Sequence, residues 1–256
     1  MTALALDVRS EQRIPLSRLV RIEVRKAVDT RAGFWLGFLI VGLSALILVL
    51  TAAGVLDSNV TDADILGHGF APVQALLPYV AILLVTSEFS ARTALTTFVL
   101  VPNRWRVITA KLLAVLVIVA VLLVSVTVLS LFAGAVSPDR VATSSGDVTL
   151  LDAFWRTGLQ TTISVVGAFG LGLLLRNTAA AIVAQTLLPL FISSALILTP
   201  GLKSAEPWVG TGALYKLTDN TPLDGTDWAQ AASATAIWLV LPLLLGLWRF
   251  NRAEIK

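Results

Sequence analysis

The sequence predicts an all-α integral membrane protein with six transmembrane helices. Three observations predict this class: the composition, the length of the apolar runs and the distribution of charge along the chain. Hydrophobic residues make up 56% of the 256 residues, charged residues make up 14%, and the mean hydropathy is +0.85. A soluble domain is about 45–50% apolar and about 25% charged. A helix that crosses the hydrocarbon core needs roughly 20 apolar residues, a length that several runs reach.

The apolar runs define six expected spans, with approximate ranges 33–55, 70–87, 107–136, 153–175, 178–198 and 231–250. The third span is long and is expected to tilt or to extend beyond the bilayer. Only Arg176 and Asn177 separate the fourth span from the fifth. One continuous helix would place Arg176 at mid-membrane, which favours two spans joined by a tight turn. The expected organisation is therefore an N-terminal segment 1–32, a six-span domain 33–250 and a tail 251–256.

Charge alternates between the segments that connect these spans. On the expected topology, 15 of the 19 Lys and Arg residues lie on one side of the membrane. Cytoplasmic loops carry the excess of Lys and Arg, so both termini are expected in the cytoplasm. Trp35 and Trp248 lie at span ends, where amphipathic rings prefer the headgroup level. Because the first span follows the polar and basic segment 1–32, it is expected to be a permanent anchor and not a cleaved signal peptide.

The segment before the first span predicts an amphipathic helix. Pro15 suits a first helical turn, where its missing N–H would have no partner. Apolar residues then recur at helical spacing, and Arg18, Arg21 and Arg25 form an adjacent basic stripe. This pattern is typical of a helix that lies in the cytoplasmic membrane interface with its arginines on lipid phosphates. The alternative is a short soluble helix that packs on another protein.

Short helices are also expected on the outer side, because the stretch 200–230 is rich in Pro, Gly and Asp but too apolar for a solvated loop.

The single histidine, His68, is predicted to lie in a solvated loop. The chain has no cysteine, so disulfides and thiolate chemistry are excluded, and one histidine cannot form a histidine metal cluster. No Gly-Lys pair exists, so the P-loop pattern for binding ATP is absent, and no hydrolase motif occurs. The expected spans hold almost no charge, which argues against an ion-coupled transporter.

Uncharged polar residues and small residues are the remaining features of the spans. Those that could line a path for an amphipathic substrate are Gln74, Gln160, Thr161, Thr162, Ser164, Gln185, Ser193 and Ser194. The alternative role for each is a hydrogen bond between helices, worth about 0.6 kcal/mol on average. Small residues four apart let two backbones approach closely. The pairs of this kind that are candidates for a dimer contact are Gly33 with Gly37 and Ala180 with Ala184.

The most informative stretch connects the second span with the third. It is basic and expected in the cytoplasm, with amphipathic helical character up to a Pro-Asn turn, so it is interpreted as a docking surface for a partner protein. Its basic residues include Arg92, Arg104 and Arg106, and Lys111 follows at the start of the third span.

At this stretch the chain resembles the membrane subunits of type-2 ATP-binding-cassette (ABC) transporters. Those permeases carry an acidic residue at the end of span two, then a Thr, a Pro-x-Arg and a Lys at the start of span three. The matching residues here are Glu88, Thr93, Pro102-Asn103-Arg104 and Lys111. Where such permeases usually have a Gly before the Thr, this chain has Arg92, so the turn there is expected to differ. The resemblance also covers the basic N-terminal helix, the end of span four before Arg176 and Asn177, and the order of six spans.

The resemblance implies an exporter permease that moves a hydrophobic or amphipathic substrate, such as a drug, natural product or lipid-like molecule. It implies no catalytic residue, metal or cofactor in this chain, and ATP-Mg on a separate cytoplasmic ABC ATPase. That ATPase docks on the segment between spans two and three, which acts as a coupling helix. The coupling residues that the resemblance implies are Glu88, Arg92, Thr93, Pro102, Arg104, Arg106 and Lys111. It further implies a second permease copy, in a homodimer or heterodimer with contacts through spans one and five, and short external helices that close an outer gate. The location it implies is a bacterial cytoplasmic membrane, with lipid and no nucleic acid among the partners. The alternatives are an ion-coupled secondary transporter and a non-transporting immunity or scaffold protein.

Overall fold

The structure, a computed structural model, describes residues 15–56, 59–90, 104–137, 148–219 and 221–252. These residues form helices and their connections, and six of the helices are long and apolar enough to cross a membrane. The first five of these are α2 (Arg31–Ala52), α3 (Asp62–Ser90), α5 (Arg104–Val136), α6 (Leu150–Leu175) and α7 (Thr178–Leu198). The sixth is the continuous helix formed by α10 (Gly225–Thr235), η3 (Ala236–Val240) and α11 (Leu241–Arg252). The chain is therefore built as a multi-pass membrane protein.

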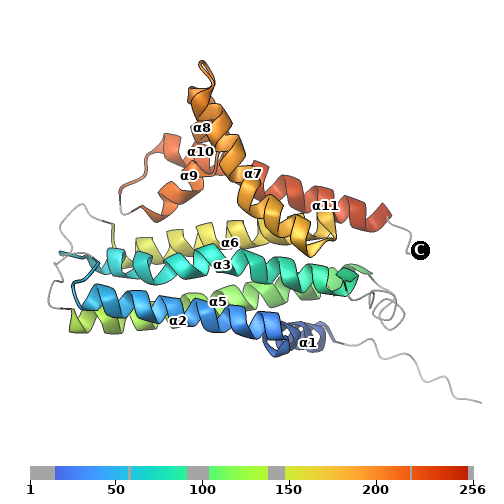
Figure 1. Cartoon of the computed structure of the whole chain (residues 1–256), viewed down its shortest axis with the longest axis horizontal. Coiled ribbons are helices and arrows are strands. Elements are labelled where there is room, and N and C mark those ends of the chain that lie inside the picture. The colour runs from blue at the N-terminus through green and yellow to red at the C-terminus, as the bar shows by residue number, and fades with distance from the viewer. Residues whose placement is uncertain (1–14, 57–58, 91–103, 138–147, 220, 253–256) are drawn as a thin grey trace, which may run out of the picture.

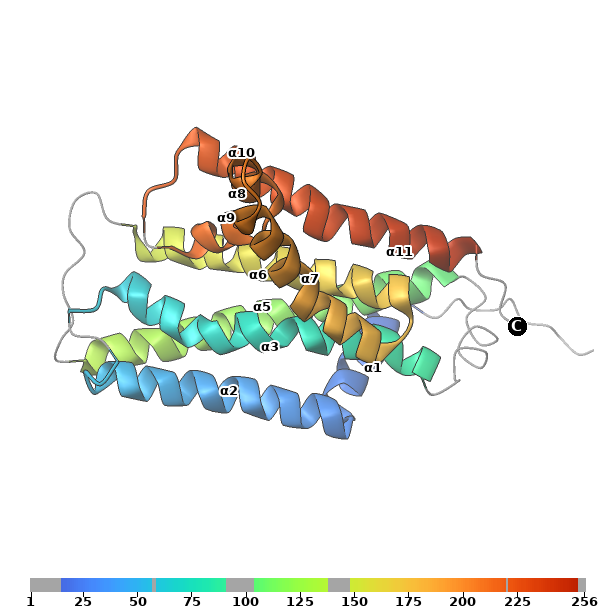
Figure 2. The same cartoon turned by 45° about the horizontal axis from the view of Figure 1, so that its top comes forward.

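The helices α2, α3, α5 and α6 run side by side in a bundle, with α7 and α11 on the α6 side (Figure 1). Helix α7 is strongly tilted and crosses this bundle at an angle (Figure 2). The apolar window is 67% buried in α3 and 61% buried in α6, against 17% in α2 and 6% in α7. The two central helices are thus α3 and α6, while α2 and α7 leave most of their apolar surface uncovered.

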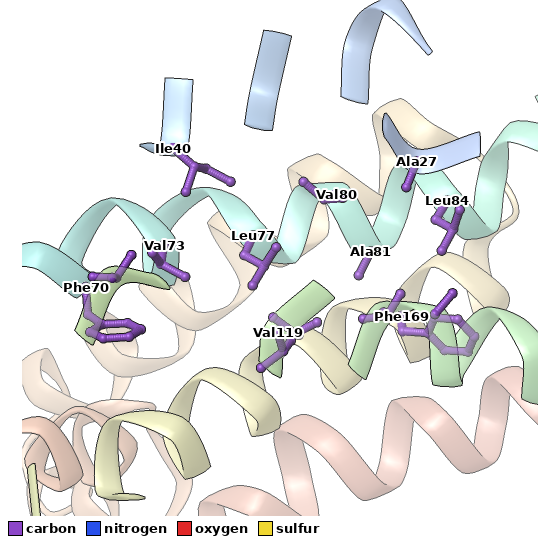
Figure 3. Close-up of a cluster of buried hydrophobic side chains, with 14 of the residues drawn as sticks. Ala27, Ile40, Phe70, Val73, Leu77, Val80, Ala81, Leu84, Val119 and Phe169 are labelled. Atoms are coloured by element: carbon purple, nitrogen blue, oxygen red, sulfur yellow. The ribbon is translucent and has the colours of Figure 1, made fainter. Parts of the chain in front are cut away.

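The largest cluster of buried apolar side chains surrounds α3. Its members come from α2, α3, α5, α6 and both ends of the described chain, and Figure 3 labels Ile40, Phe70, Val73, Leu77, Leu84, Val119 and Phe169 among them. On the other side of α6, packing depends on small residues. A Cβ on Gly170 would lie 2.6 Å from the backbone nitrogen of Leu243, and a Cβ on Gly246 would lie 2.7 Å from the Gly170 carbonyl oxygen. Glycine at both positions therefore lets the α6 and α11 backbones touch.

The predicted N-terminal helix is present as α1 (Leu16–Asp29), which begins directly after Pro15. It lies at the end of the bundle where α3 and α11 finish and where α5 and α7 begin, here called the α1 end (Figure 1). Thr30 joins α1 to α2 by accepting a hydrogen bond from the Gly33 backbone N–H at 3.2 Å. A side chain on Gly33 would meet the Ala27 carbonyl oxygen, so this sharp turn requires glycine.

The break predicted between the fourth and fifth spans is confirmed. Arg176 ends α6 in the left-handed conformation, with φ of 54°, and Asn177 caps α7 by accepting from the Ala180 N–H at 3.0 Å. The Arg176 guanidinium donates to the Arg249 carbonyl oxygen at 2.8 Å, and Arg249 donates back to the Leu174 carbonyl oxygen. These two contacts tie the end of α6 to the end of α11.

The expected span of residues 178–198 coincides with α7, but several other helices begin earlier than predicted. Helix α3 begins at Asp62, where Thr61 and Asp64 exchange capping hydrogen bonds, and not near residue 70. The prediction of a loop around His68 is wrong for this reason: His68 lies within α3, and its Nδ1 is 3.3 Å from the Thr51 hydroxyl of α2. The last span likewise begins at Gly225, behind a capping box formed by Asp224 and Asp227.

The short helices expected in the stretch 200–230 are confirmed as η1 (Lys203–Ala205), α8 (Glu206–Val209), α9 (Gly212–Tyr215) and η2 (Lys216–Thr218). Side chains from the neighbouring long helices hold them in place. Trp238 Nε1 donates to the Val209 carbonyl oxygen at 2.8 Å, and Lys216 forms an ion pair with Asp227 at 2.9 Å. The hydrogen bond to Asp227 raises the pKa of Lys216. These contacts pack the short helices against the sixth span and against α6.

Candidate functional site

Of the residues predicted to dock a partner, Arg92, Thr93 and Pro102 lie outside the described residues. Glu88 lies in the last turn of α3 and Arg104 in the first turn of α5, so both fall at the α1 end. Arg106 follows in the same turn of α5 and is half-buried. The predicted docking segment therefore leaves and re-enters the bundle next to α1.

Lys111, the last of the predicted docking residues, forms a buried ion pair. Its Nζ donates to Glu23 Oε2 at 2.6 Å and to the Leu84 carbonyl oxygen at 3.2 Å. The Lys111 and Glu23 side chains are 5% and 7% exposed. Lys26 donates to the other carboxylate oxygen of Glu23 at 2.7 Å. One carboxylate therefore holds two ammonium groups and joins α1 to α5, while Lys111 also reaches α3.

Glu23 was missed from the sequence because the neighbouring arginines dominate the charge of the helix. A signal was present in its spacing: Val20, Glu23, Val24 and Ala27 share one helical face, which is the face that packs on the bundle. An acid on the apolar face of an amphipathic helix requires a partner, because an unpaired buried charge is strongly unfavourable. Lys111 at the start of the third span is that partner.

A polar cavity of about 260 Å³ is the second candidate site, and it lies between α3, α6, α7, α9 and η3. Four of the predicted path residues line it: Gln74, Gln160, Ser164 and Gln185. The Tyr79 and Thr186 hydroxyls, 3.0 Å apart, join α3 to α7 at its wall. The structure thus brings polar residues from three spans to one space inside a single chain.

The other path and dimer candidates lie elsewhere. The Ser193 hydroxyl oxygen would lie 2.7 Å from a Cβ built on Gly210, so Ser193 packs close to Gly210. Ser194 is half-buried on α7. Ala180 is exposed, and Gly37 is half-buried, although a Cβ on Gly37 would meet no atom within 4 Å. Ala184 is half-buried. The pairing of these small residues with a second copy stays a prediction, although Gly33 already has a use within the chain.

The membrane-interface candidates are distributed as an interfacial helix requires. Arg18, Arg21 and Arg25 are all exposed on α1, and Arg25 pairs with Asp29 at 3.0 Å. Trp35 and Trp248 are 65% and 55% exposed. Both lie near the α1 end, in the first turns of α2 and the last turns of α11. The basic and aromatic groups therefore surround the same end of the bundle.

Among the residues that the structure describes, no three His, Asp or Glu side chains group closely enough to hold a metal ion. No protein-family model matches the chain, and no curated protein matches its sequence. The features of the chain that bear on its function are the ion pair at the α1 end, the cavity and the order of the helices.

Proposed function

We propose that this chain is the permease subunit of an ATP-driven exporter of the type-2 ABC class. It moves a hydrophobic or amphipathic molecule out of the cytoplasm or inner leaflet, and a separate cytoplasmic ATPase subunit binds the ATP-Mg. The observation that carries the proposal is the buried Glu23–Lys111 ion pair at the α1 end. The pair links α1 to α3 and α5, the two helices that the predicted docking segment connects. A displacement of that segment would therefore be transmitted to all three helices.

The arrangement of the remaining helices supports the same function. An amphipathic helix precedes six spans, and short helices lie between the fifth span and the sixth, which is the order expected of such permeases. Helices α2 and α7 are 17% and 6% buried in their apolar windows, and this leaves two faces for lipid or for a second permease copy. In this proposal the chain lies in a bacterial inner membrane, and the α1 end with its exposed arginines lies on the cytoplasmic side.

In the working cycle, binding of ATP to the partner shifts the permease between inward-open and outward-open states. The partner contacts Glu88, Arg92, Thr93, Arg104 and Arg106, and the ion pair carries the displacement into α3 and α5. Movement of whole helices is the usual form of such a transition, because packed cores switch between discrete arrangements. The tilted α7 is the least buried of the six spans, so little packing within the chain restrains it.

The proposal predicts that a P-loop ATPase co-purifies with the tagged protein from the membranes of its own host. Replacing both Arg104 and Arg106 by glutamate should abolish this association, because both residues lie where the docking segment joins the start of α5. Arg252→Glu is the matched control, since it reverses an exposed charge at the same end of the bundle on a different helix. The ATPase is identified by mass spectrometry of the purified material.

Each alternative function has its own outcome. Absence of an ATPase from the wild-type preparation, in detergents that keep the protein intact, would contradict the proposal and favour a secondary transporter. An ATPase that binds steadily but hydrolyses ATP at the same rate with and without the membrane subunit would favour a scaffold or immunity protein. Loss of the ATPase in the Arg252→Glu control as well would show that the effect is not specific to the docking segment, and this would contradict the role proposed for that segment.

A further inference from the structure

Two segments of the chain share the pattern Gln-x-Leu-Leu-Pro. One is Gln74–Pro78 in α3 and the other is Gln185–Pro189 in α7. The glutamine, the residue after it and the proline of both segments line the polar cavity. The same five-residue pattern therefore contributes the same three positions to the cavity from two different helices.

The prolines alter the backbone at this place. Proline has no N–H, so Pro78 cannot donate to the Gln74 carbonyl and Pro189 cannot donate to the Gln185 carbonyl. In the sixth span, Pro242 likewise cannot donate to the carbonyl of Trp238, which also lines the cavity. The backbone there forms the π-helical turn η3. In a membrane, a backbone group released from its helix is retained where other polar groups or a cavity can satisfy it. Three residues that line the cavity thus carry carbonyls without their usual helical donor.

Gln160 supplies an independent indication that the cavity takes a ligand. This side chain lines the cavity from α6, and the residue is 4% exposed. Its Oε1 has no hydrogen-bond partner within the described part of the chain. Nearby Thr161 and Thr162, in contrast, donate to carbonyl oxygens of their own helix at 2.7 Å. A buried amide acceptor left without a donor is unfavourable, so a donor from a bound molecule would stabilise it.

The lining of the cavity determines the class of molecule. Every residue that lines it is uncharged, and apolar groups such as Ile163, Leu214 and Trp238 alternate with the glutamines. An ionic ligand would lose its hydration here without gaining an opposite charge. We propose that this cavity, within one chain, binds an uncharged amphipathic molecule that donates hydrogen bonds from hydroxyl or amide groups. The assignment of this molecule as the transported substrate rests on the proposed function; the binding itself does not.

The chain has no cysteine, so a single Ser164→Cys substitution places one reactive thiol in the cavity wall. The measurement is the rate of its alkylation by N-ethylmaleimide in the purified full chain, without any ATPase. The four probes each carry a phenyl ring on a four-carbon chain and differ at the end of that chain: 4-phenylbutan-1-ol, butylbenzene, 4-phenylbutan-1-amine and 4-phenylbutyrate. The alcohol should slow alkylation at a concentration about fivefold lower than butylbenzene, the size expected for one added hydrogen bond. The charged amine and carboxylate should protect no better than butylbenzene.

The variant Gln160→Leu, combined with the reporter, should remove the advantage of the alcohol over butylbenzene, with the rate for each probe expressed relative to the rate of the same variant without probe. Gln230→Leu is the matched control, because Gln230 also has a buried Oε1 without a partner among the described residues but does not line the cavity. Ala75→Cys, which lines the cavity from α3, is a second reporter that must give the same order of probes.

Three results would overturn the proposal: equal protection by alcohol and butylbenzene, best protection by the amine, or an unchanged advantage of the alcohol in Gln160→Leu. Failure of all four probes to protect either reporter would overturn it too. None of these results bears on whether an ATPase co-purifies, so the cavity and the proposed function can fail separately.

Discussion

Replacement of Lys111 by methionine is expected to destabilise the protein by about 3–5 kcal/mol, because it leaves a buried carboxylate without its closest partner. Methionine fills a similar volume, so the loss reports the charge and not a cavity. The Lys111 Nζ also bridges to the Leu84 carbonyl oxygen, and therefore α3 loses its link to α1 in the same variant. The expected result is a fall of about 10 °C in the midpoint of thermal unfolding in one fixed detergent.

Two controls separate the ion pair from a general effect of substitution. Lys26→Met removes the other ammonium group on Glu23, but its side chain is 44% exposed, so the expected loss is about 1 kcal/mol or less. The double variant Glu23→Leu with Lys111→Met removes both charges and should recover most of the stability, because a hydrophobic replacement of a buried pair is often neutral. If Lys111→Met unfolds at the wild-type temperature, or if the double variant is less stable than the single one, the ion pair does not hold α1.

The second large effect is expected at the contact between α6 and α11. In Gly170→Ala the new methyl group would lie 2.6 Å from the Leu243 nitrogen and 2.8 Å from the Pro242 carbonyl carbon, both of them backbone atoms. Backbone atoms cannot rotate away as a side chain can, so the two helices must separate. Overpacking of this kind destabilises by about 1–3 kcal/mol, and more where the backbone must move. We expect the unfolding midpoint to fall by about 5–10 °C.

Gly42→Ala is the matched control for this prediction. Gly42 lies in α2, and a Cβ there would meet no atom within 4 Å. Alanine favours a helix over glycine by about 1 kcal/mol, so this variant should be as stable as the wild type or slightly more stable. Equal unfolding midpoints for Gly170→Ala and Gly42→Ala would show that the close approach of α6 and α11 does not contribute to stability.

Hydropathy located the spans because the need for apolar length is independent of how the helices pack. It placed the start of α3 too late, since the first two turns contain Asp62, Asp64 and His68, which reduce the local hydropathy. These polar residues serve the end of the helix: Asp64 caps it, and His68 contacts Thr51. The start of a span can be predicted better when capping residues are considered together with apolar runs.

The ion pair was not predicted. Lys111 was selected, from a family resemblance, as a residue that docks the partner, whereas Glu23, with which it pairs, lies 88 positions away in the chain and in a helix expected to contact lipid. Such a pairing depends on how α1 packs against α5, and no local pattern contains that information. The charge of Glu23 on an apolar face was a local sign that some partner existed, but it could not identify which one.

The cavity was predicted only in part, because the sequence does not show which polar residues of the spans face the same space. Gln160 and Gln185 were selected as polar residues in spans, yet Ser193 and Ser194 were selected by the same criterion and do not line the cavity. Polarity alone cannot distinguish a residue that faces a cavity from one that bonds within its helix. The repeated Gln-x-Leu-Leu-Pro pattern is a more specific signal, because a proline four residues after a glutamine combines a side-chain amide with a carbonyl released from the helix.

The central claim is that ATP hydrolysed by a separate subunit drives this permease. The most direct test uses the Ser164→Cys reporter in native membranes, where partners are present, and measures its alkylation rate under two conditions. One is ATP-Mg with vanadate, which arrests ATPases after hydrolysis, and the other is an imposed proton or sodium gradient without nucleotide. Thr226→Cys, an exposed position at the start of α10, serves as the control. We expect nucleotide with vanadate to change the alkylation rate at Ser164→Cys and not at Thr226→Cys, and we expect neither gradient to change it. A rate at Ser164→Cys that responds to a gradient and not to nucleotide would show that an ATPase does not drive this protein.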